Sequence, residues 1–381
     1  MRISFCSFGG PLFILCFTWS LSAGAAVVKS VQTGTITMSP ATQTVTITSV
    51  DTGKTFVICQ SDTGGNNNDS TLRVTCELTN STMLTITANA AFATQTVRWY
   101  VVEFFSGVSV QRGLTSLGAS LTVDVPIAAV VLAKTFVLMS ERINDGSTNR
   151  DERWTTTAEL TSTTNLRLTR TDASGGNAPS IAWQVIQIAS AEVQSGAAAI
   201  AQGALSTTAP LSPAVDTTRT FLVFTTSAGD AINGVESRYM TTGVLTNATT
   251  LTFTRALIRN VAGGQVDIRW FAVRMTDGTT VQRGLAGPSG TGAGSATMNA
   301  TLAPAIVTNR SVPIISVMGD AGSNASTNLN DTSWKAAFTS TTNLQLTRVA
   351  ANNSNATVAW QVVQFANTPN RVDGDGREIF Q

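Results

Sequence analysis

The groups that could do chemistry in this chain are carboxylates and arginines, because its 381 residues include no histidine. Ser-His-Asp and Cys-His nucleophiles, histidine acid–base steps and histidine metal sites are therefore excluded. Paired carboxylates remain, as in glycoside hydrolysis. The residues four places after the four recurring tryptophans are Glu103, Gln187, Arg274 and Gln364. Only one of the four copies therefore has a carboxylate at this position. We expect a protein that is not an enzyme and uses no cofactor.

Two acidic segments could carry chemistry, the first as a catalytic carboxylate site and the second as a calcium site. Residues 145–152 carry three carboxylates without a counterpart of similar charge elsewhere in the chain. Residues 373–378 place oxygen ligands at alternate positions, as a calcium loop does, but a basic residue interrupts them. We interpret the first as a solvated loop and the second as a flexible terminus, and predict no metal site.

Three arginines recur after a Leu-Thr pair, at Arg170, Arg255 and Arg348. One interpretation is an outward charge that keeps a threonine-rich sheet from pairing edge to edge. The alternative is a guanidinium fork for a sugar hydroxyl or a carboxylate. The arginines are therefore candidate ligand-binding residues.

Three aromatic residues occupy comparable places before a Leu-Thr corner, at Trp154, Tyr239 and Trp334. They pack in a core or form a platform on which a sugar stacks. We include them with the arginines as candidate ligand-binding residues.

A Val-Gln-x-Gly tetrapeptide returns at domain-sized intervals, starting at Val31, Val110, Val193 and Val281. In each interval a Phe-containing strand, a Leu-Thr corner, a strand ending in Leu-Thr-Arg or its variant, and a tryptophan strand follow in the same order, although the fourth copy substitutes some of these residues. The chain is therefore predicted to hold four copies of one small domain.

A second level of duplication groups the copies in pairs. Residues 160–170 and 338–348 are nearly identical, whereas the first and third copies instead place an aromatic residue after the tryptophan, Tyr100 and Phe271. The layout is A-B-A-B.

A sequence rich in Thr, Val and Ile favours β-sheet. Clusters of Gly, Asn, Asp and Ser separate five or six candidate strands in each copy. We predict an all-β fold of four tandem small antiparallel β-sandwich domains of about six strands each. The predicted repeats are 26–109, 110–192, 193–280 and 281–371, followed by a tail, 372–381. The tryptophans predicted to lie in the structural cores are Trp99, Trp183, Trp270 and Trp360.

Both faces of the tryptophan strand are apolar. Trp99 and Val101 point one way, and Tyr100 and Val102 the other, because side chains alternate along a strand. Such a strand is covered on both sides, or its second face meets a neighbouring domain or subunit. We hypothesise that the second face packs domain against domain.

The N-terminus reads as a secretory signal peptide, residues 1–25, with Arg2, an apolar run over 11–21 and a small-residue cleavage site before Ala26. An uncleaved anchor is the alternative. No later segment is predicted to span a membrane. In an exported chain, Cys59 and Cys76 are expected to form a disulfide, the alternative being two buried thiols.

The net charge is +1, charged residues make up 12% of the chain, and no basic cluster is present. Nucleic acid is therefore excluded as a partner, because binding it needs a basic stripe to neutralise phosphates.

The opening Val-Gln-Ser/Thr-Gly strand, the Phe-containing second strand, the turn before a strand like 85–87 and the closing aliphatic-x-Trp strand resemble the H-type lectin domain. That family comprises six-stranded sandwiches of snail agglutinins and discoidins, and the resemblance covers nearly the whole mature chain, four times over. It implies binding of N-acetylgalactosamine or galactose-type sugars and oligomers, typically trimers.

The sugar site of that family does not carry over. Its arginine before the corner is replaced by Glu77, Glu159, Val244 and Ala337, and its histidine near the tryptophan strand has no equivalent. We expect a secreted or cell-surface structural or adhesive protein that self-associates or contacts glycans and cell-surface components. The alternative is a lectin with one shallow sugar site per repeat or per pair.

Overall fold

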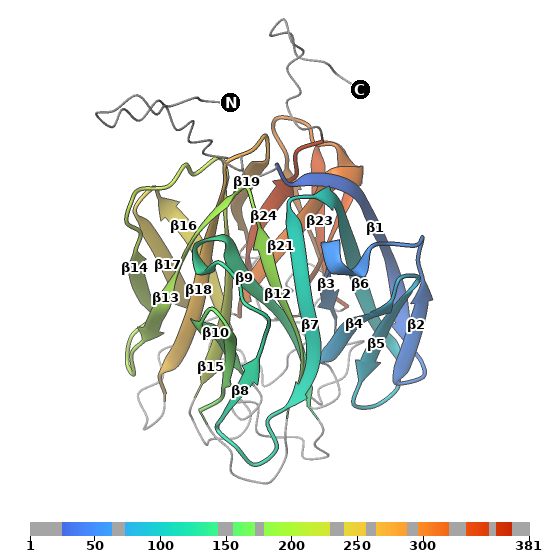
Figure 1. Ribbon diagram of the computed structural model, residues 1–381, viewed down its shortest axis with the longest axis horizontal. Coiled ribbons are helices and arrows are strands. Elements are labelled where there is room, and N and C mark those ends of the chain that lie inside the picture. Colours follow the sequence, from blue (N-terminus) through green and yellow to red (C-terminus); the bar gives the residue numbers. More distant parts are fainter. Residues whose placement is uncertain are drawn as a thin grey trace, which may run out of the picture.

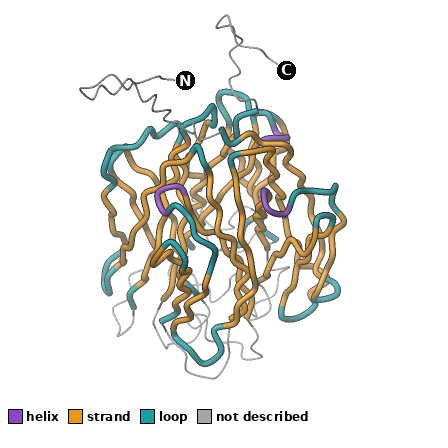
Figure 2. Tube along the Cα trace, in the orientation of Figure 1, coloured by secondary structure: helices purple, strands orange, loops and turns teal. Residues whose placement is uncertain are grey.

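The computed structural model describes residues 25–62, 73–143, 155–171, 179–228, 240–256, 264–287, 296–319, 333–349 and 356–367. Regular structure in these ranges is strand, apart from the short 3₁₀ turns η1 (Thr52–Lys54), η3 (Leu132–Lys134) and η6 (Thr308–Arg310). Figure 2 shows strands running through the whole body of the molecule. The predicted all-β class is confirmed.

Each repeat forms two three-stranded antiparallel sheets, which we call the inner and the outer sheet. The inner sheets, in repeat order, are β1 (Val27–Met38), β6 (Phe92–Ser106) and β3 (Thr55–Ser61); β7 (Val108–Ser116), β12 (Pro179–Ile188) and β9 (Thr135–Ile143); β13 (Ala191–Ile200), β18 (Val266–Met275) and β15 (Thr220–Ala228); and β19 (Thr280–Ala286), β24 (Thr357–Gln364) and β21 (Ser311–Met318).

The outer sheets, in the same order, are β2 (Thr42–Thr46), β5 (Met83–Ala88) and β4 (Val74–Asn80); β8 (Thr122–Pro126), β11 (Asn165–Thr169) and β10 (Thr157–Ser162); β14 (Ser206–Pro210), β17 (Thr250–Arg255) and β16 (Thr241–Asn247); and β20 (Thr297–Thr301), β23 (Asn343–Thr347) and β22 (Lys335–Ser340). Every repeat therefore has the same six strands in the same sheet order. The Val-Gln-x-Gly motif lies inside the first strand of each repeat, since β7 already begins at Val108 and β13 at Ala191.

The glutamine of Val-Gln-x-Gly fastens the loop after the first outer strand. Gln32 accepts the N–H of Thr48 at 2.7 Å and donates to its carbonyl at 2.9 Å. Gln111 binds the N–H and carbonyl of Ala128 in the same way. Gln194 and Gln282 each bind a proline carbonyl and the N–H of the residue before that proline. One side chain thus fixes the same loop in all four repeats.

The second face of each tryptophan strand packs against the other repeats. Tyr100, Ile186, Val273 and Val363 all lie in one buried cluster, which also contains residues of β3, β9, β15 and β21. Three phenylalanines of this cluster, Phe56, Phe104 and Phe365, contact one another at centroid distances of 5.1 to 6.1 Å, and Phe365 meets the other two rings edge to face. The hypothesis that this face joins domain to domain is confirmed, and the inner sheets share a single central core.

Four equivalent hydrogen bonds join the repeats into a closed ring. In each, a backbone N–H of β4, β10, β16 or β22 donates to a side chain on the inner sheet of the next repeat. The fourth bond returns to repeat 1. The bonds run from Cys76 N to Ser140 Oγ (2.9 Å), from Ala158 N to Thr225 Oγ1 (2.9 Å), from Gly243 N to Ser316 Oγ (3.1 Å) and from Ala336 N to Gln60 Oε1 (2.7 Å).

Further contacts close the junction between the last repeat and the first. Lys335 pairs with Asp62, the hydroxyl of Tyr100 donates to the Ala336 carbonyl at 2.7 Å, and Val28 N–H donates to the Ala366 carbonyl at 3.1 Å. In Figure 1 the orange and red strands of repeat 4 accordingly lie next to the blue strands of repeat 1. The chain is a single-chain ring with a pseudo-fourfold axis through the central core.

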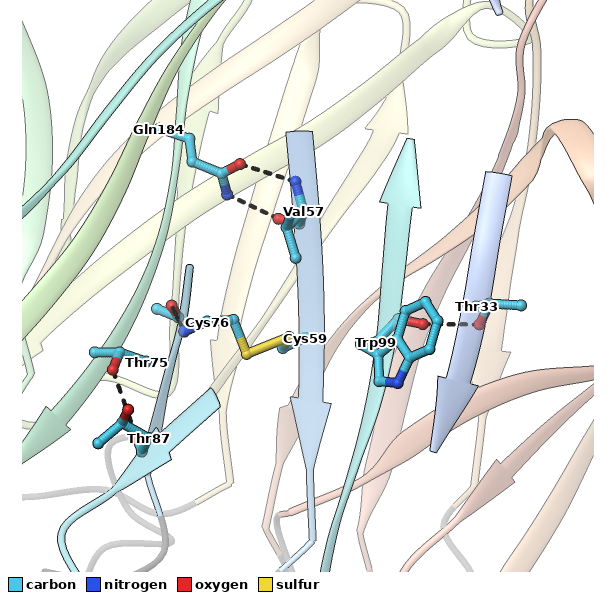
Figure 3. The surroundings of a disulfide bond; sticks show 9 residues. Thr33, Val57, Cys59, Thr75, Cys76, Thr87, Trp99 and Gln184 are labelled. Carbon is cyan, nitrogen blue, oxygen red and sulfur yellow. Dashed lines mark hydrogen bonds between the residues drawn. A yellow bond between two sulfur atoms is a disulfide. The ribbon is translucent and has the colours of Figure 1, made fainter. Parts of the chain in front are cut away.

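The A-B alternation distinguishes two kinds of junction in this ring. Gln184 of repeat 2 accepts the N–H and donates to the carbonyl of Val57 in repeat 1, both at 2.8 Å (Figure 3). Gln361 of repeat 4 does the same with Leu222 of repeat 3. The A repeats have the aromatic Tyr100 and Phe271 at this place. The glutamine–backbone pair therefore seals the 1–2 and 3–4 junctions.

A disulfide joins Cys59 on β3 to Cys76 on β4, with a Cα–Cα distance of 6.4 Å (Figure 3). It connects the inner and outer sheets of repeat 1 and confirms the expected pairing. It also lies at the 1–2 junction, because the N–H of Cys76 is one of the four ring bonds.

Candidate functional site

The three recurring arginines are buried, so their interpretation as outward charges is wrong. Arg170 donates to the carbonyls of Gly118 at 2.7 Å and Ser120 at 3.1 Å. Arg255 binds three backbone carbonyls, and the Arg348 guanidinium lies 5.1 Å from the ring centroid of Trp334. Their exposed fractions are only 1 to 4%. The guanidinium groups of Arg170 and Arg255 hold loops of their own repeats, which leaves them little surface for a ligand.

The aromatic candidates divide between buried and undescribed positions. Trp334 is buried in the core of repeat 4. Trp154 and Tyr239 lie outside the described residues. The tryptophans Trp99, Trp183, Trp270 and Trp360 are all buried, and each faces the glycine of Val-Gln-x-Gly across the inner sheet.

In three of the four repeats, the residue four after the tryptophan has a structural task. The Glu103 carboxylate accepts a hydrogen bond from the N–H of Asp51 at 2.8 Å and forms an ion pair with Lys29 at 2.9 Å. Gln187 and Gln364 likewise accept the backbone N–H that precedes a 3₁₀ turn. The carboxylate of Glu103 is thus one of several acceptors that hold this turn.

A hollow lined by all four repeats lies on the pseudo-fourfold axis. It is a cavity of about 440 Å³, partly open to solvent, at the ends of β3, β9, β15 and β21. All four repeats line it with equivalent stretches of strand. No repeat could form this cavity alone.

The strand alternation that builds the central core also builds this cavity. Its floor is apolar and consists of Leu138, Val223 and Ile314, which also pack against the central core. The side chains that accept the four ring hydrogen bonds form the wall, and on β9, β15 and β21 they lie two residues after the floor residue. These are Ser140, Thr225, Ser316 and Gln60.

One ion pair lies at the cavity, between Arg73 of repeat 1 and Glu141 of repeat 2. Burial raises the pKa of Glu141 to about 7, against the opposing effect of Arg73 and a smaller one of Thr156. Thr156 approaches this carboxyl group through both its hydroxyl and its backbone N–H. A perturbed carboxyl group in a concave site marks a candidate functional site.

Two further arginines have lowered pKa values for a structural reason. Arg112 and Arg283 follow the glutamine of Val-Gln-x-Gly in the B repeats, and burial lowers the pKa of both, that of Arg283 to about 10. Each donates to a backbone carbonyl of the preceding repeat, at Thr55 and Thr220. They stabilise the same two junctions as Gln184 and Gln361.

Among the described residues, no His, Cys, Asp and Glu side chains gather in a group of three that could hold a metal ion. The acidic segments 145–152 and 373–378 lie outside the described residues. In the part of the chain that the structure describes, no helix is long and apolar enough to cross a membrane.

No family model matches the chain, and no curated protein matches it.

Sequence reasoning did not predict the axial cavity, because its residues come from four separate repeats. The sequence of β9, the Phe-containing strand of repeat 2, held a partial signal. It has an acidic residue, Glu141, at a position that the other copies fill with Ser61, Thr226 and Val317. Only ring closure shows that these places meet.

Proposed function

We propose that the chain is a secreted, non-catalytic structural or adhesive protein, in which four sandwiches form one compact display unit. The observation that supports this proposal is the closed ring of equivalent hydrogen bonds. The recurring glutamines, arginines and tryptophans all serve to build or join the repeats, so repetition here maintains a scaffold.

The outer sheets supply the surface that such a scaffold would display. Their exposed positions are rich in threonine, as in β2, where Thr42, Thr44 and Thr46 face outward. Threonine pairs such as Thr246 and Thr252, 2.6 Å apart between hydroxyl oxygens, order these faces. The apolar strand faces that could have joined separate subunits are used within the chain, so self-association would use the outer faces or the loops.

A direct test uses the mature chain from Ala26 coupled to beads and presented to cells of the producing organism. Saturable adhesion, lost when the ring is unfolded by reduction and mild denaturant, is the expected result. Mass spectrometry of exported protein should find an N-terminus at Ala26. Absence of adhesion together with retention of the protein inside the cell would contradict the proposal.

The second candidate function is carbohydrate binding, favoured by the six-stranded sandwiches with Val-Gln-x-Gly in their first strands. Because Arg170, Arg255, Arg348 and Trp334 are buried, a sugar would have to bind elsewhere on the molecule. A glycan array distinguishes the two functions. Saturable binding that free sugar abolishes would favour the lectin, and adhesion without any glycan signal would favour the structural role.

A further inference from the structure

A second pocket lies where repeat 3 meets repeat 4, and we call it the junction pocket. It has a volume of about 510 Å³ and is partly open to solvent. Leu245 and Asn247 come from the end of β16, and Thr217 comes from the segment before β15. Val281 and Arg283 come from β19, the first strand of repeat 4. Neither repeat could form this pocket alone.

Arg283 brings a positive charge to the junction pocket without forming an ion pair among the described residues. Its Nη2 atom donates to the Thr220 carbonyl. Its Nη1 atom has no hydrogen-bond partner in the described ranges and is not among the buried atoms. Other partly buried arginines, such as Arg73 and Arg269, pair with a glutamate. Nη1 of Arg283 is therefore available to an anion that enters the pocket.

The surroundings of Arg283 disfavour its charge. Burial lowers its pKa to about 10, against the attraction of Asp216. Asp216 does not line the pocket, and its carboxylate already accepts the N–H and the hydroxyl of Thr218 and pairs with Arg219. An anion next to the guanidinium would favour the charged form of Arg283, because opposite charges a few ångströms apart stabilise each other.

Two more hydrogen-bond donors line the same pocket. Asn247 uses its Oδ1 atom to accept the N–H and the hydroxyl of Thr249, so both protons of its amide nitrogen remain to be donated. The Thr217 hydroxyl has no partner within the described part of the chain, and it can donate as well. The pocket therefore offers neutral donors in addition to the guanidinium.

The rest of the lining is apolar. Leu245 and Val281 belong to it. Leu285 follows Arg283 on the same face of β19, because side chains alternate along a strand, and 60% of its surface is exposed. A ligand that places a negative group at Arg283 can thus lay a hydrocarbon part against its neighbours on the strand.

From this juxtaposition of an unpaired guanidinium, neutral donors and an apolar lining, we propose that the junction pocket binds a small organic carboxylate with an apolar body. The carboxylate accepts hydrogen bonds from Arg283 Nη1 and from Asn247, and the apolar body lies against Leu245 and Val281. One guanidinium balances one carboxylate, whereas a doubly charged anion would keep an uncompensated charge. The site goes beyond the scaffold role proposed above and does not use the exposed faces of the outer sheets.

The A-B alternation confines this cation to two of the four junctions. Repeats 1 and 3 have Thr33 and Ser195 in the place of Arg283. Arg112 has that place at the 1–2 junction, where it donates to the Thr55 carbonyl as Arg283 does to Thr220. Substitution of Arg112 therefore removes an equivalent bond far from the junction pocket and serves as a matched control.

The test titrates benzoate into a chain that begins at Ala26 and carries labelled methyl groups, with detection by NMR. The signals of Leu245 and Val281 are expected to shift saturably, while those of Leu84 and Leu166, in the cores of repeats 1 and 2, stay in place. Benzamide has the same shape without the charge, benzamidine is positive, and sulfate and glucuronate lack the apolar body. Each is expected to bind at least about tenfold more weakly than benzoate.

Variants then assign the binding to one side chain. Arg283→Gln should weaken benzoate at least about tenfold, Arg283→Lys should keep part of the affinity, and Arg112→Gln should leave the Leu245 and Val281 shifts unchanged. Unshifted signals in the wild-type protein would overturn the proposal, whatever the folding of the variants. It would equally be overturned if benzamide, sulfate or glucuronate bound as tightly as benzoate, or if Arg112→Gln weakened binding as much as Arg283→Gln.

Discussion

Gly34 lies directly opposite Trp99 on the neighbouring inner strand, and a Cβ atom on Gly34 would come within 2.5 Å of the indole Cζ2 atom. The same pairing joins Gly113 to Trp183, Gly196 to Trp270 and Gly284 to Trp360, at 2.5 to 2.7 Å. Real Cβ contacts are not this short. The glycine and the tryptophan recur together because the indole occupies the place of the missing side chain.

Substitution of this glycine should therefore destabilise the fold. Gly113→Ala forces the Trp183 ring or the strand to move, which we expect to lower the free energy of unfolding by about 1 to 3 kcal/mol. Chemical denaturation checks this value. The control is Gly278→Ala, where the added Cβ would lie 3.5 Å from Ala366, an ordinary contact. Equal stability of the two variants would show that the indole is not confined by the glycine.

The disulfide replaces a packing contact that the other repeats make without sulfur. In the places of Cys59 and Cys76, repeat 2 has Met139 and Ala158, repeat 3 has Phe224 and Gly243, and repeat 4 has Ile315 and Ala336. In repeat 3 the fit is close, because a Cβ on Gly243 would lie 2.5 Å from Phe224. A large residue thus faces a small one wherever the bond is absent.

The Cys59→Ser, Cys76→Ser variant should lose about 3 kcal/mol of unfolding free energy, since the bond closes a loop across a sequence separation of 17. The Cys59→Met, Cys76→Ala variant copies repeat 2 and should recover part of that loss by packing. Thermal denaturation of both variants under oxidising conditions measures the difference. If the Met-Ala pair proves no better than the Ser pair, the four places are not equivalent.

Ring closure depends on Gln60, whose side chain accepts the N–H of Ala336 at 2.7 Å and donates to the Pro313 carbonyl at 3.1 Å. Gln60→Leu would leave both buried groups without these partners, so we expect a loss of roughly 2 to 5 kcal/mol. Gln32→Leu removes a similar pair of bonds at an exposed place and should cost about 1 kcal/mol.

Hydrogen exchange at the Ala336 amide gives a local reading of the same change. Gln60→Leu should speed exchange there, and Gln32→Leu should not. Equal losses of stability and an unchanged Ala336 amide would show that the 4–1 junction is held by other contacts.

The alternation of side chains along a strand predicts that the recurring arginines are buried. Leu168 and Arg170 lie two residues apart, and period-two alternation places them on the same face, toward the core. The arginine is therefore buried, against the usual preference of a charge, because backbone carbonyls surround its guanidinium. The tryptophan and glutamine motifs, by contrast, identified the repeats because their contacts lie within one repeat.

The cavity was beyond such reasoning for a physical reason. Ser140 and Thr225 line one cavity only when the four repeats form a closed ring. No local sequence pattern indicates that four repeats, rather than three or six, complete this ring. The resemblance to a family of oligomeric domains led to an expectation of assembly between chains. Here the equivalent apolar faces meet inside one chain.

Stability should depend on pH through Glu141. Burial raises its pKa in the folded protein to about 7 from the ordinary 4.5, so the folded state binds this proton more tightly than the unfolded state. Its contribution is fully present below pH 4.5 and is lost as the pH rises toward 7, a change of about 3 kcal/mol. Because the chain has no histidine, no ordinary histidine titration overlaps the upper part of this window.

Urea denaturation of a chain that begins at Ala26, at a series of pH values from about 4.5 to 8, measures this dependence. Glu141→Gln should remove most of the slope, since the amide does not titrate. Glu77→Gln is the matched control, because burial also raises the pKa of Glu77, which lies outside the axial cavity. If Glu141→Gln keeps the wild-type slope while Glu77→Gln loses it, the perturbed carboxyl group is not in the cavity.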